Sequence, residues 1–191
     1  MGFALLCALM TGTTAMFLVG DGPADRRPAG ESAAPHLPSG ARPPDGYQRM
    51  RDPAGYRLDV PVGWNRSTKD GSVFYTSPDG KSIIQIFSPG GHRTPYDSLK
   101  AAEVSLRKQP GFRRVRAELI GPYVNEGAQL EYLYQNHQSG LVRVLVRYFS
   151  GADKLSYALL LIDPADQGSG PQRQRQRIIL RSFCPITHCP R

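Results

Sequence analysis

Apolar and polar residues alternate with a period of two along much of the chain after residue 46, which predicts strands with one buried face. In residues 56–60, Tyr56, Leu58 and Val60 would point to one side of a strand, and Arg57 and Asp59 to the other. Similar patterns and turn signals predict further strands at residues 47–51, 73–76, 82–88, 112–119, 129–135, 141–149 and 155–162. The short loops between several of these strands favour antiparallel hairpins.

Proline and glycine residues mark where strands end. Pro61 has no backbone donor and ends the strand at residues 56–60, and Gly63 allows a tight corner. This corner would turn Trp64 inward as a core residue, with a binding platform as the alternative role for its ring. The segment Ser77-Pro78-Asp79-Gly80 has the residues of a type I turn, which would join two strands in a hairpin.

Two segments have the features of helices. Thr94, Pro95 and Asp97 supply an N-cap, a proline at the first helical position and an acid in the first turn. Apolar residues then follow at helical spacing, at Leu99, Ala102 and Leu106. Gln109-Pro110-Gly111 ends this helix. A second helix is predicted over roughly residues 172–182, with Ile178, Ile179 and Phe183 placed for packing.

Apolar residues occupy both faces of the last predicted strands. In residues 141–149, Val142 and Val144 belong to one face, and Leu145 and Phe149 to the other. Both faces of the sheet are therefore expected to be covered. Two helices and an antiparallel sheet of about six or seven strands predict an α+β fold, an α/β/α sandwich with a helix on each face.

The N-terminal segment differs in character from the rest of the chain. Residues 1–20 carry no charged side chain, and this length matches the hydrocarbon core of a bilayer. We expect an uncleaved transmembrane helix, because no basic region precedes the apolar run and no clean cleavage site follows it. A signal peptide, with a weak cleavage site at Thr13-Thr14-Ala15, and a start inside a longer membrane protein are the two other interpretations.

Composition divides the remainder of the chain. Residues 21–45 are rich in proline, alanine and glycine and poor in large apolar residues, which predicts a semi-rigid linker. Residues 46–183 are long enough to bury a core and form the predicted globular domain. Residues 184–191 are assigned to a tail.

The chain has a net charge of +8 and a pI of about 9.7, but its basic residues are dispersed. We therefore expect no nucleic-acid partner. The dense basic stretch over residues 172–177 alternates glutamine with arginine. Alternate residues do not share one face of a helix, so this stretch is expected to be mostly a solvated surface.

Motifs of catalysis are absent from the sequence. There is no Gly-x-Ser-x-Gly or His-Glu-x-x-His pattern, and the glycine-rich loop, His-Arg-Asp and Asp-Phe-Gly motifs of protein kinases are missing. The histidines fall in predicted loops, the linker or the tail, at His36, His92, His137 and His188. We expect no catalytic residues and no cofactor, and we do not expect an enzyme.

Cys184 and Cys189 lie close together near the end of the chain. A local disulfide is the leading interpretation if the domain is exported, because such compartments are oxidising. A zinc site that includes His188 and a pair of free thiols are the alternatives. No metal site is predicted, and Cys7, within the apolar segment, is expected to stay unpaired.

The candidate ligand-binding residues are Glu131, Arg143 and Arg147, which fall on two neighbouring predicted strands. If their faces coincide, the carboxylate would neutralise one arginine and leave the other for an anionic ligand. A purely structural ion pair is the alternative. Four tyrosines on the late strands would either line a cleft or pack in the core: Tyr132, Tyr134, Tyr148 and Tyr157.

Several motifs in order carry a resemblance to a known family: the segment from Asp52 to Trp64, Ser77-Pro78-Asp79-Gly80, Pro110-Gly111-Phe112, Leu130-Glu131-Tyr132 and Ser182-Phe183. They resemble the extracytoplasmic modules of actinobacterial serine/threonine protein kinases and related membrane proteins, which have a Mog1/PsbP/LpqN-like fold. The resemblance covers roughly residues 46–183 and does not include the kinase domain.

This layout predicts a non-catalytic, membrane-anchored, sensor-like module that binds a ligand or an envelope protein outside the cytoplasm. The chain would cross the cell membrane once, through its N-terminal helix. The alternative is a secreted or anchored carrier that holds a lipid or another small apolar molecule between sheet and helix. A continuous apolar cavity would favour the carrier, and a filled core with an exposed groove would favour the binding module.

Overall fold

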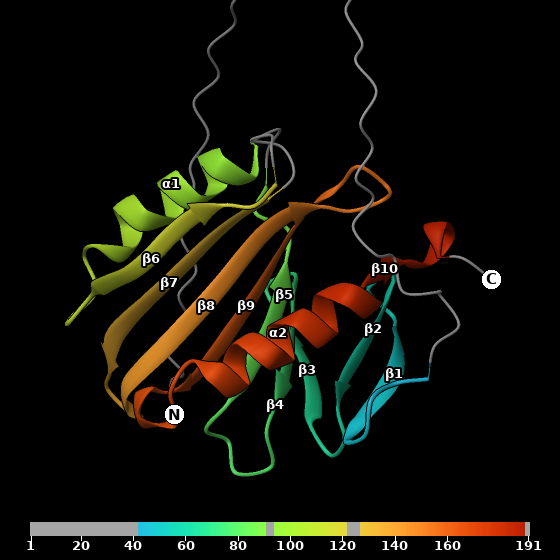
Figure 1. Cartoon of the computed structure of the whole chain (residues 1–191), viewed down its shortest axis with the longest axis horizontal. Coiled ribbons are helices and arrows are strands. Elements are labelled where there is room, and N and C mark those ends of the chain that lie inside the picture. Colours follow the sequence, from blue (N-terminus) through green and yellow to red (C-terminus); the bar gives the residue numbers. More distant parts are fainter. Residues whose placement is uncertain (1–41, 91–93, 122–126, 190–191) are drawn as a thin grey trace, which may run out of the picture. The chain divides into compact units, whose positions relative to one another are not determined.

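The computed structural model describes residues 42–90, 94–121 and 127–189 (Figure 1). The predicted transmembrane helix at residues 1–20 and almost all of the predicted linker lie outside the described residues. The elements are β1 (Tyr47–Asp52), β2 (Tyr56–Pro61), β3 (Asn65–Lys69), β4 (Ser72–Thr76), β5 (Ile83–Phe87), α1 (Pro95–Leu106), β6 (Arg113–Leu119), β7 (Gly127–Asn136), β8 (Gly140–Ser150), β9 (Ser156–Pro164), α2 (Gly170–Ser182) and β10 (Cys184–Pro185). Short 3-10 helices follow β9, at Ala165–Gln167, and β10, at Ile186–His188.

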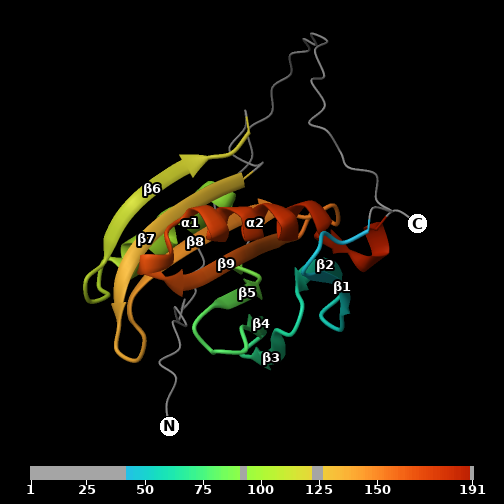
Figure 2. The same cartoon turned by 60° about the horizontal axis from the view of Figure 1, so that its bottom comes forward.

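The strands form two antiparallel sheets. Seven strands make the larger one, in the order β3-β4-β5-β9-β8-β7-β6, and three make the smaller one, in the order β1-β2-β10. The two helices cover opposite faces of the larger sheet (Figures 1 and 2). Helix α1 packs on β7 and β8, whereas α2 packs on the other face, against β9 and against β2 of the smaller sheet. The prediction of an antiparallel sheet of about six or seven strands with two helices is confirmed, whereas the separate small sheet was not predicted.

Local signals position α1. The hydroxyl of Thr94 accepts a hydrogen bond from the backbone N–H of Asp97 (3.1 Å), and the Asp97 carboxylate accepts one from the backbone N–H of Thr94 (3.2 Å). This reciprocal capping box satisfies two backbone donors that the first turn leaves free. It fixes where the helix begins, and Leu99 and Leu106 consequently face the sheet.

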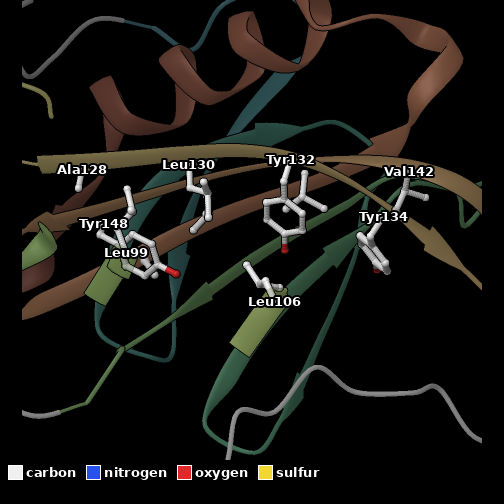
Figure 3. Packing of buried hydrophobic residues seen from close by; sticks show 11 residues of the cluster. Leu99, Leu106, Ala128, Leu130, Tyr132, Tyr134, Val142 and Tyr148 are labelled. Carbon is white, nitrogen blue, oxygen red and sulfur yellow. The ribbon is translucent and has the colours of Figure 1, made fainter. Parts of the chain in front are cut away.

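The core beneath α1 is built from alternate residues of the central strands. Leu99 and Leu106 pack against Leu130 and three tyrosines, and all of these side chains are buried (Figure 3). The tyrosines are Tyr132, Tyr134 and Tyr148. They are core residues on this face, which agrees with one of the two interpretations from the sequence. They do not line a cleft, which was the other interpretation.

A second core lies on the opposite face, beneath α2. It joins Tyr56, Leu58 and Val60 of β2 to the large sheet and to Ile179 of α2. The sheet contributes buried residues from β4, β5 and β9, at Val73, Tyr75, Ile84, Ile86, Leu159 and Leu161. The period-two pattern of β2 thus decides how the small sheet attaches to the large one.

Two elements escaped the sequence prediction for physical reasons. Every residue of β3 is exposed, and the strand (Asn-Arg-Ser-Thr-Lys) has no apolar face that a pattern could reveal. β10 has only two residues, yet it pairs with β2, and the N–H of Ile186 donates to the carbonyl oxygen of Gly55 (2.9 Å). Residues 184–188, assigned to a tail by the sequence, therefore belong to the fold.

The prediction that residues 172–177 form a mostly solvated surface is wrong. Gln172 and Gln176 are buried, and with Ile179 they form the face of α2 that meets the sheet. The Gln172 amide donates to the carbonyl oxygens of Arg143 (3.0 Å) and Leu161 (3.1 Å). Residues four apart share a helix face, so this spacing, rather than the alternation, carried the signal.

Trp64 turns toward the core, as the sequence predicted, but it is only half-buried. Its ring packs against the second core, and the guanidinium of Arg175 lies 5.0 Å from the ring centroid. A cation above the ring face is attracted by the aromatic quadrupole and shields that face from water.

We expect Trp64→Ala to lower the free energy of unfolding by about 2 kcal/mol, below the range for a fully buried tryptophan, because part of the ring is already hydrated. Urea unfolding monitored by circular dichroism measures this change. Val62→Ala is the matched control, because Val62 is 60% exposed in the same corner and should change stability by less than about 0.5 kcal/mol. Equal effects of the two substitutions would contradict the packing role of the ring.

Candidate binding site

A row of polar side chains crosses the α2-side face of β7 and β8. Gln129 and Glu131 belong to β7, and Arg143 and Arg147 to β8. Antiparallel pairing places Gln129 opposite Arg147, and Glu131 two residues diagonally from Arg143. Cross-strand neighbours on one face are close enough for direct contact, so the register decides which arginine meets the carboxylate.

Glu131 is the anionic centre of this row. Its side chain is buried, one carboxylate oxygen accepts from Nη1 of Arg143 (2.7 Å), and the other accepts from Nη2 of Arg173 on α2. Two guanidinium groups therefore surround one carboxylate. This arrangement ties α2 to β7 and β8, and it satisfies a charge that would be costly to bury alone.

Arg147 has a different environment. Its Nε and Nη2 both donate to Oε1 of Gln129 (3.1 and 3.0 Å), and the Gln129 amide nitrogen donates to Oε1 of Glu118 (3.0 Å). Among the described residues, no carboxylate lies within ion-pair distance of Arg147. Burial lowers the pKa of the Arg147 guanidinium from its ordinary value, an effect that the negative charge of Glu118 opposes.

Arg147 lines an open pocket of about 320 Å³ between β8 and the end of α2. Phe149, Leu180 and Phe183 supply an apolar wall, and the loop after β8 and the start of β10 complete the lining. The rings of Phe149 and Phe183 meet edge to face with centroids 5.2 Å apart. Such aromatic packing makes this wall a stable surface.

A disulfide lies beside the pocket. Cys184, one of the lining residues, is bonded to Cys189, and the two Cα atoms are 5.4 Å apart. This connects Cys189 to β10, which pairs with β2. Within the part of the chain that the structure describes, no cluster of His, Cys, Asp and Glu side chains is arranged to hold a metal ion.

The three candidate residues from the sequence thus lie on one face and separate into two groups. Glu131 and Arg143 form an ion pair, and Arg147 lines the pocket without a carboxylate partner. Sequence reasoning missed Gln129 and Arg173, which complete the two groups. The period-two pattern places Gln129 on the same strand face as Glu131, and this pattern could have identified Gln129. No local pattern indicates that Arg173 reaches Glu131 from another element.

The architecture defines a Mog1/PsbP-like α/β/α sandwich. The Saccharomyces cerevisiae Ran-binding protein Mog1p is similar to this chain with a TM-score of 0.51 and 9% identity, over 73% of this chain and 95% of that one. Cyanobacterial PsbP (CyanoP) from Synechocystis is similar with a TM-score of 0.52 and 16% identity, over 72% of this chain and 91% of that one. At these identities the likeness concerns the fold alone.

The chain belongs to the serine/threonine kinase C-terminal domain family, whose sequence profile matches residues 48–185. This confirms the family that the motifs indicated. A comparison with curated proteins found no match. Among the described residues, no helix is long and apolar enough to cross a membrane.

Proposed function

We propose that the protein is a non-catalytic, membrane-anchored module that binds a ligand or partner outside the cytoplasm, at the pocket between β8 and the end of α2. One observation carries the proposal. Arg147 is a half-buried cation that lines this pocket and has no carboxylate partner among the described residues. A concave site with an apolar wall and one oriented polar group is the usual form of a binding site.

Membership in a kinase-associated family supports an accessory role, since the sequence has none of the phosphate-binding or catalytic motifs of a kinase. The apolar run at residues 1–20 and the proline-rich linker after it support a tethered domain. In this arrangement the domain binds a ligand or partner outside the cytoplasm. The identity of that ligand or partner decides whether the protein acts in signalling or in envelope maintenance.

The packing favours the binding module over the apolar carrier. Side chains of Leu99 and Leu106 occupy the space between α1 and the sheet (Figure 3). Ile179 occupies the space beneath α2. A carrier would need an apolar cavity at one of these interfaces. The open pocket lies instead at the end of α2, with a charged side chain in its wall.

Native mass spectrometry of the full chain, extracted from its own membranes in a non-ionic detergent, tests binding. We expect a bound molecule or protein of defined mass in the parent chain and its loss in Arg147→Gln. Arg113→Gln is the matched control, because it removes the same charge from an exposed position outside the pocket. A parent chain without any bound species, or equal occupancy in all three proteins, would refute the proposal.

The membrane anchor is tested separately. We expect the mature protein to retain residues 1–20 and to remain in the membrane fraction after a carbonate wash, because about twenty uncharged residues suffice to span a bilayer. N-terminal sequencing of the mature protein decides the matter. A mature chain that begins after residue 15 would exclude the anchor and favour the signal peptide.

A further inference from the structure

We infer that the ligand of the Arg147 pocket is a small organic monoanion, with an oxyanion head on Arg147 and a compact apolar body on the wall formed by Phe149, Leu180 and Phe183. This inference rests on the proposed function and names the chemical class of ligand at the same site. It follows from the free donors of Arg147, the way the guanidinium is held, the composition of the wall and the size of the pocket.

The donors of Arg147 that remain free have the geometry of an oxyanion site. Gln129 accepts from Nε and from Nη2, which are the donors on one edge of the guanidinium plane. Nη1 has no hydrogen bond to a described residue, and a second N–H of Nη2 points away from the shared edge. The free Nη1–Nη2 edge presents two parallel donors, which match the two oxygens of a carboxylate or phosphate group.

The guanidinium is also held in place. Gln129 lies directly opposite Arg147 in the ladder between β7 and β8, and its side chain is buried. Its amide is oriented from both sides, because the oxygen accepts from Arg147 while the nitrogen donates to Glu118 (3.0 Å). A cation fixed in this way loses little side-chain entropy when an anion binds, which favours affinity.

The contrast with Arg143 shows why the site lies at Arg147. Arg143 and Arg173 both donate to the buried carboxylate of Glu131, so an incoming anion would have to compete with an existing ion pair. Glu118 reaches Arg147 only through the amide of Gln129. The charge of Arg147 is therefore partly desolvated and is not directly neutralised by a described residue.

The wall of the pocket suits an apolar body and carries no acidic side chain. The nearby carboxylate of Asp153 is engaged within its own loop, where it accepts from the hydroxyl of Tyr157 (2.6 Å) and the N–H of Leu155 (3.1 Å). Gly151 holds this loop close to the sheet, because a Cβ at that position would lie 2.6 Å from the ring of Tyr157. The aromatic wall and the loop thus line the same pocket as Arg147.

The charge of the lining residues and the size of the pocket narrow the chemical class of the ligand further. Arg147 is the one charged residue among those that line the pocket, so a single negative charge is the best electrostatic match. A volume of about 320 Å³ lies at the small end of ligand pockets and is too small to enclose a long-chain lipid body. The shared chemistry of the ligand is therefore an oxyanion attached to a ring or a short alkyl group.

Heteronuclear NMR on the 15N-labelled full chain in a non-ionic detergent tests the inference. The probes are benzoate, phenyl phosphate and the neutral benzyl alcohol, each titrated separately at about pH 5, below the second pKa of about 6 of a phosphate monoester, so that both anions carry about one negative charge. We expect benzoate or phenyl phosphate to shift the Nε–H signal of Arg147 and the amide signals of Phe149 and Ala152 in a saturable manner. Benzyl alcohol should bind more weakly by about tenfold to a hundredfold, because it makes no charge-assisted hydrogen bonds.

The two anions distinguish the head group, since preference for benzoate assigns a carboxylate and preference for phenyl phosphate assigns a phosphate ester. Arg147→Gln should weaken anion binding by about tenfold or more. Arg147→Lys should recover part of the affinity, because lysine keeps the charge but lacks the two parallel donors of the guanidinium group. Arg113→Gln should bind like the parent. Unchanged thermal unfolding shows that the variants are folded.

Two results on the parent chain alone would overturn the inference: no saturable shift at these positions with either anion, or equal affinity for benzyl alcohol. The proposed function can fail independently. If the extracted chain carries a neutral molecule or a protein while the anions do not bind, the proposed binding function is supported and the inferred ligand class is wrong. If the anions bind but the extracted chain carries nothing, the site stands and the proposed function fails.

Discussion

Glu131→Gln is expected to lower the free energy of unfolding by about 3 kcal/mol, one of the two largest effects that we predict for a polar substitution in this domain. The buried carboxylate accepts from Arg143 and Arg173 at once. Glutamine keeps the size of the side chain but removes its charge, and its amide nitrogen would face guanidinium donors. Two cations then remain partly buried without a counter-charge. Urea unfolding monitored by circular dichroism measures the loss.

Glu118→Gln is the matched control on the neighbouring strand β6. The Glu118 side chain is 33% exposed and lies 3.6 Å from Arg116, so water already screens its charge. We expect this substitution to cost less than about 1 kcal/mol. If the two variants lost the same stability, burial of the ion pair at Glu131 would not be the cause, and the contribution of this cluster to holding α2 on the sheet would be rejected.

The second large effect is expected for Asp52→Asn, at about 3 kcal/mol. Asp52 ends β1, and its buried carboxylate accepts from Nε and Nη2 of Arg66 on β3, both at 2.7 Å. It also accepts from the hydroxyl of Tyr75 on β4 and from the backbone N–H of Ala54 (2.8 Å). One side chain therefore links the small sheet to the edge of the large sheet.

Asp45→Asn serves as the control for Asp52→Asn, because Asp45 is exposed just before β1. Its replacement should change stability by less than about 0.5 kcal/mol. Thermal and urea unfolding of both variants provide the comparison. A loss of less than 1 kcal/mol for Asp52→Asn, on the order of an exposed pair, would contradict the linking role.

Asp52 also makes stability depend on pH. Burial acts to raise the pKa of Asp52, but the hydrogen bonds from Arg66, Tyr75 and the N–H of Ala54 outweigh it, and the folded-state pKa lies below the ordinary value of 3.8. The stabilisation is therefore fully present above about pH 4 and is lost as the pH falls through the lowered folded-state pKa. We expect the difference in stability between the parent chain and Asp52→Asn to shrink below about pH 4.

The sequence by itself determined the elements whose signals are local. The hairpin at Ser77-Pro78-Asp79-Gly80 is present, with the N–H of Gly80 donating to the carbonyl oxygen of Ser77 (2.9 Å). The start of α1 at Thr94 and the alternation along β8 were equally readable. Caps, turns and period-two patterns act between residues a few positions apart, so the chain encodes them without reference to the rest of the fold.

The sequence predicted the candidate residues of the site, but not how they pair. The alternation placed Glu131, Arg143 and Arg147 on their strand faces, but it could not say which arginine the carboxylate would neutralise. The register of β7 against β8 decides this, since it sets Gln129 opposite Arg147. Register depends on the whole sheet and its covering helix, because a shift by one residue would turn every side chain to the other face.

The tertiary structure alone decided the remaining features. Arg173 reaches Glu131 from a helix 42 positions further along the chain, and the fully exposed strand β3 exists because β4 offers it a ladder. The pocket arises where β8, the end of α2 and β10 meet, and these three segments share no local pattern. The sequence determined secondary structure and core faces, whereas long-range packing decided which polar groups were paired and left Nη1 of Arg147 without a hydrogen bond to a described residue.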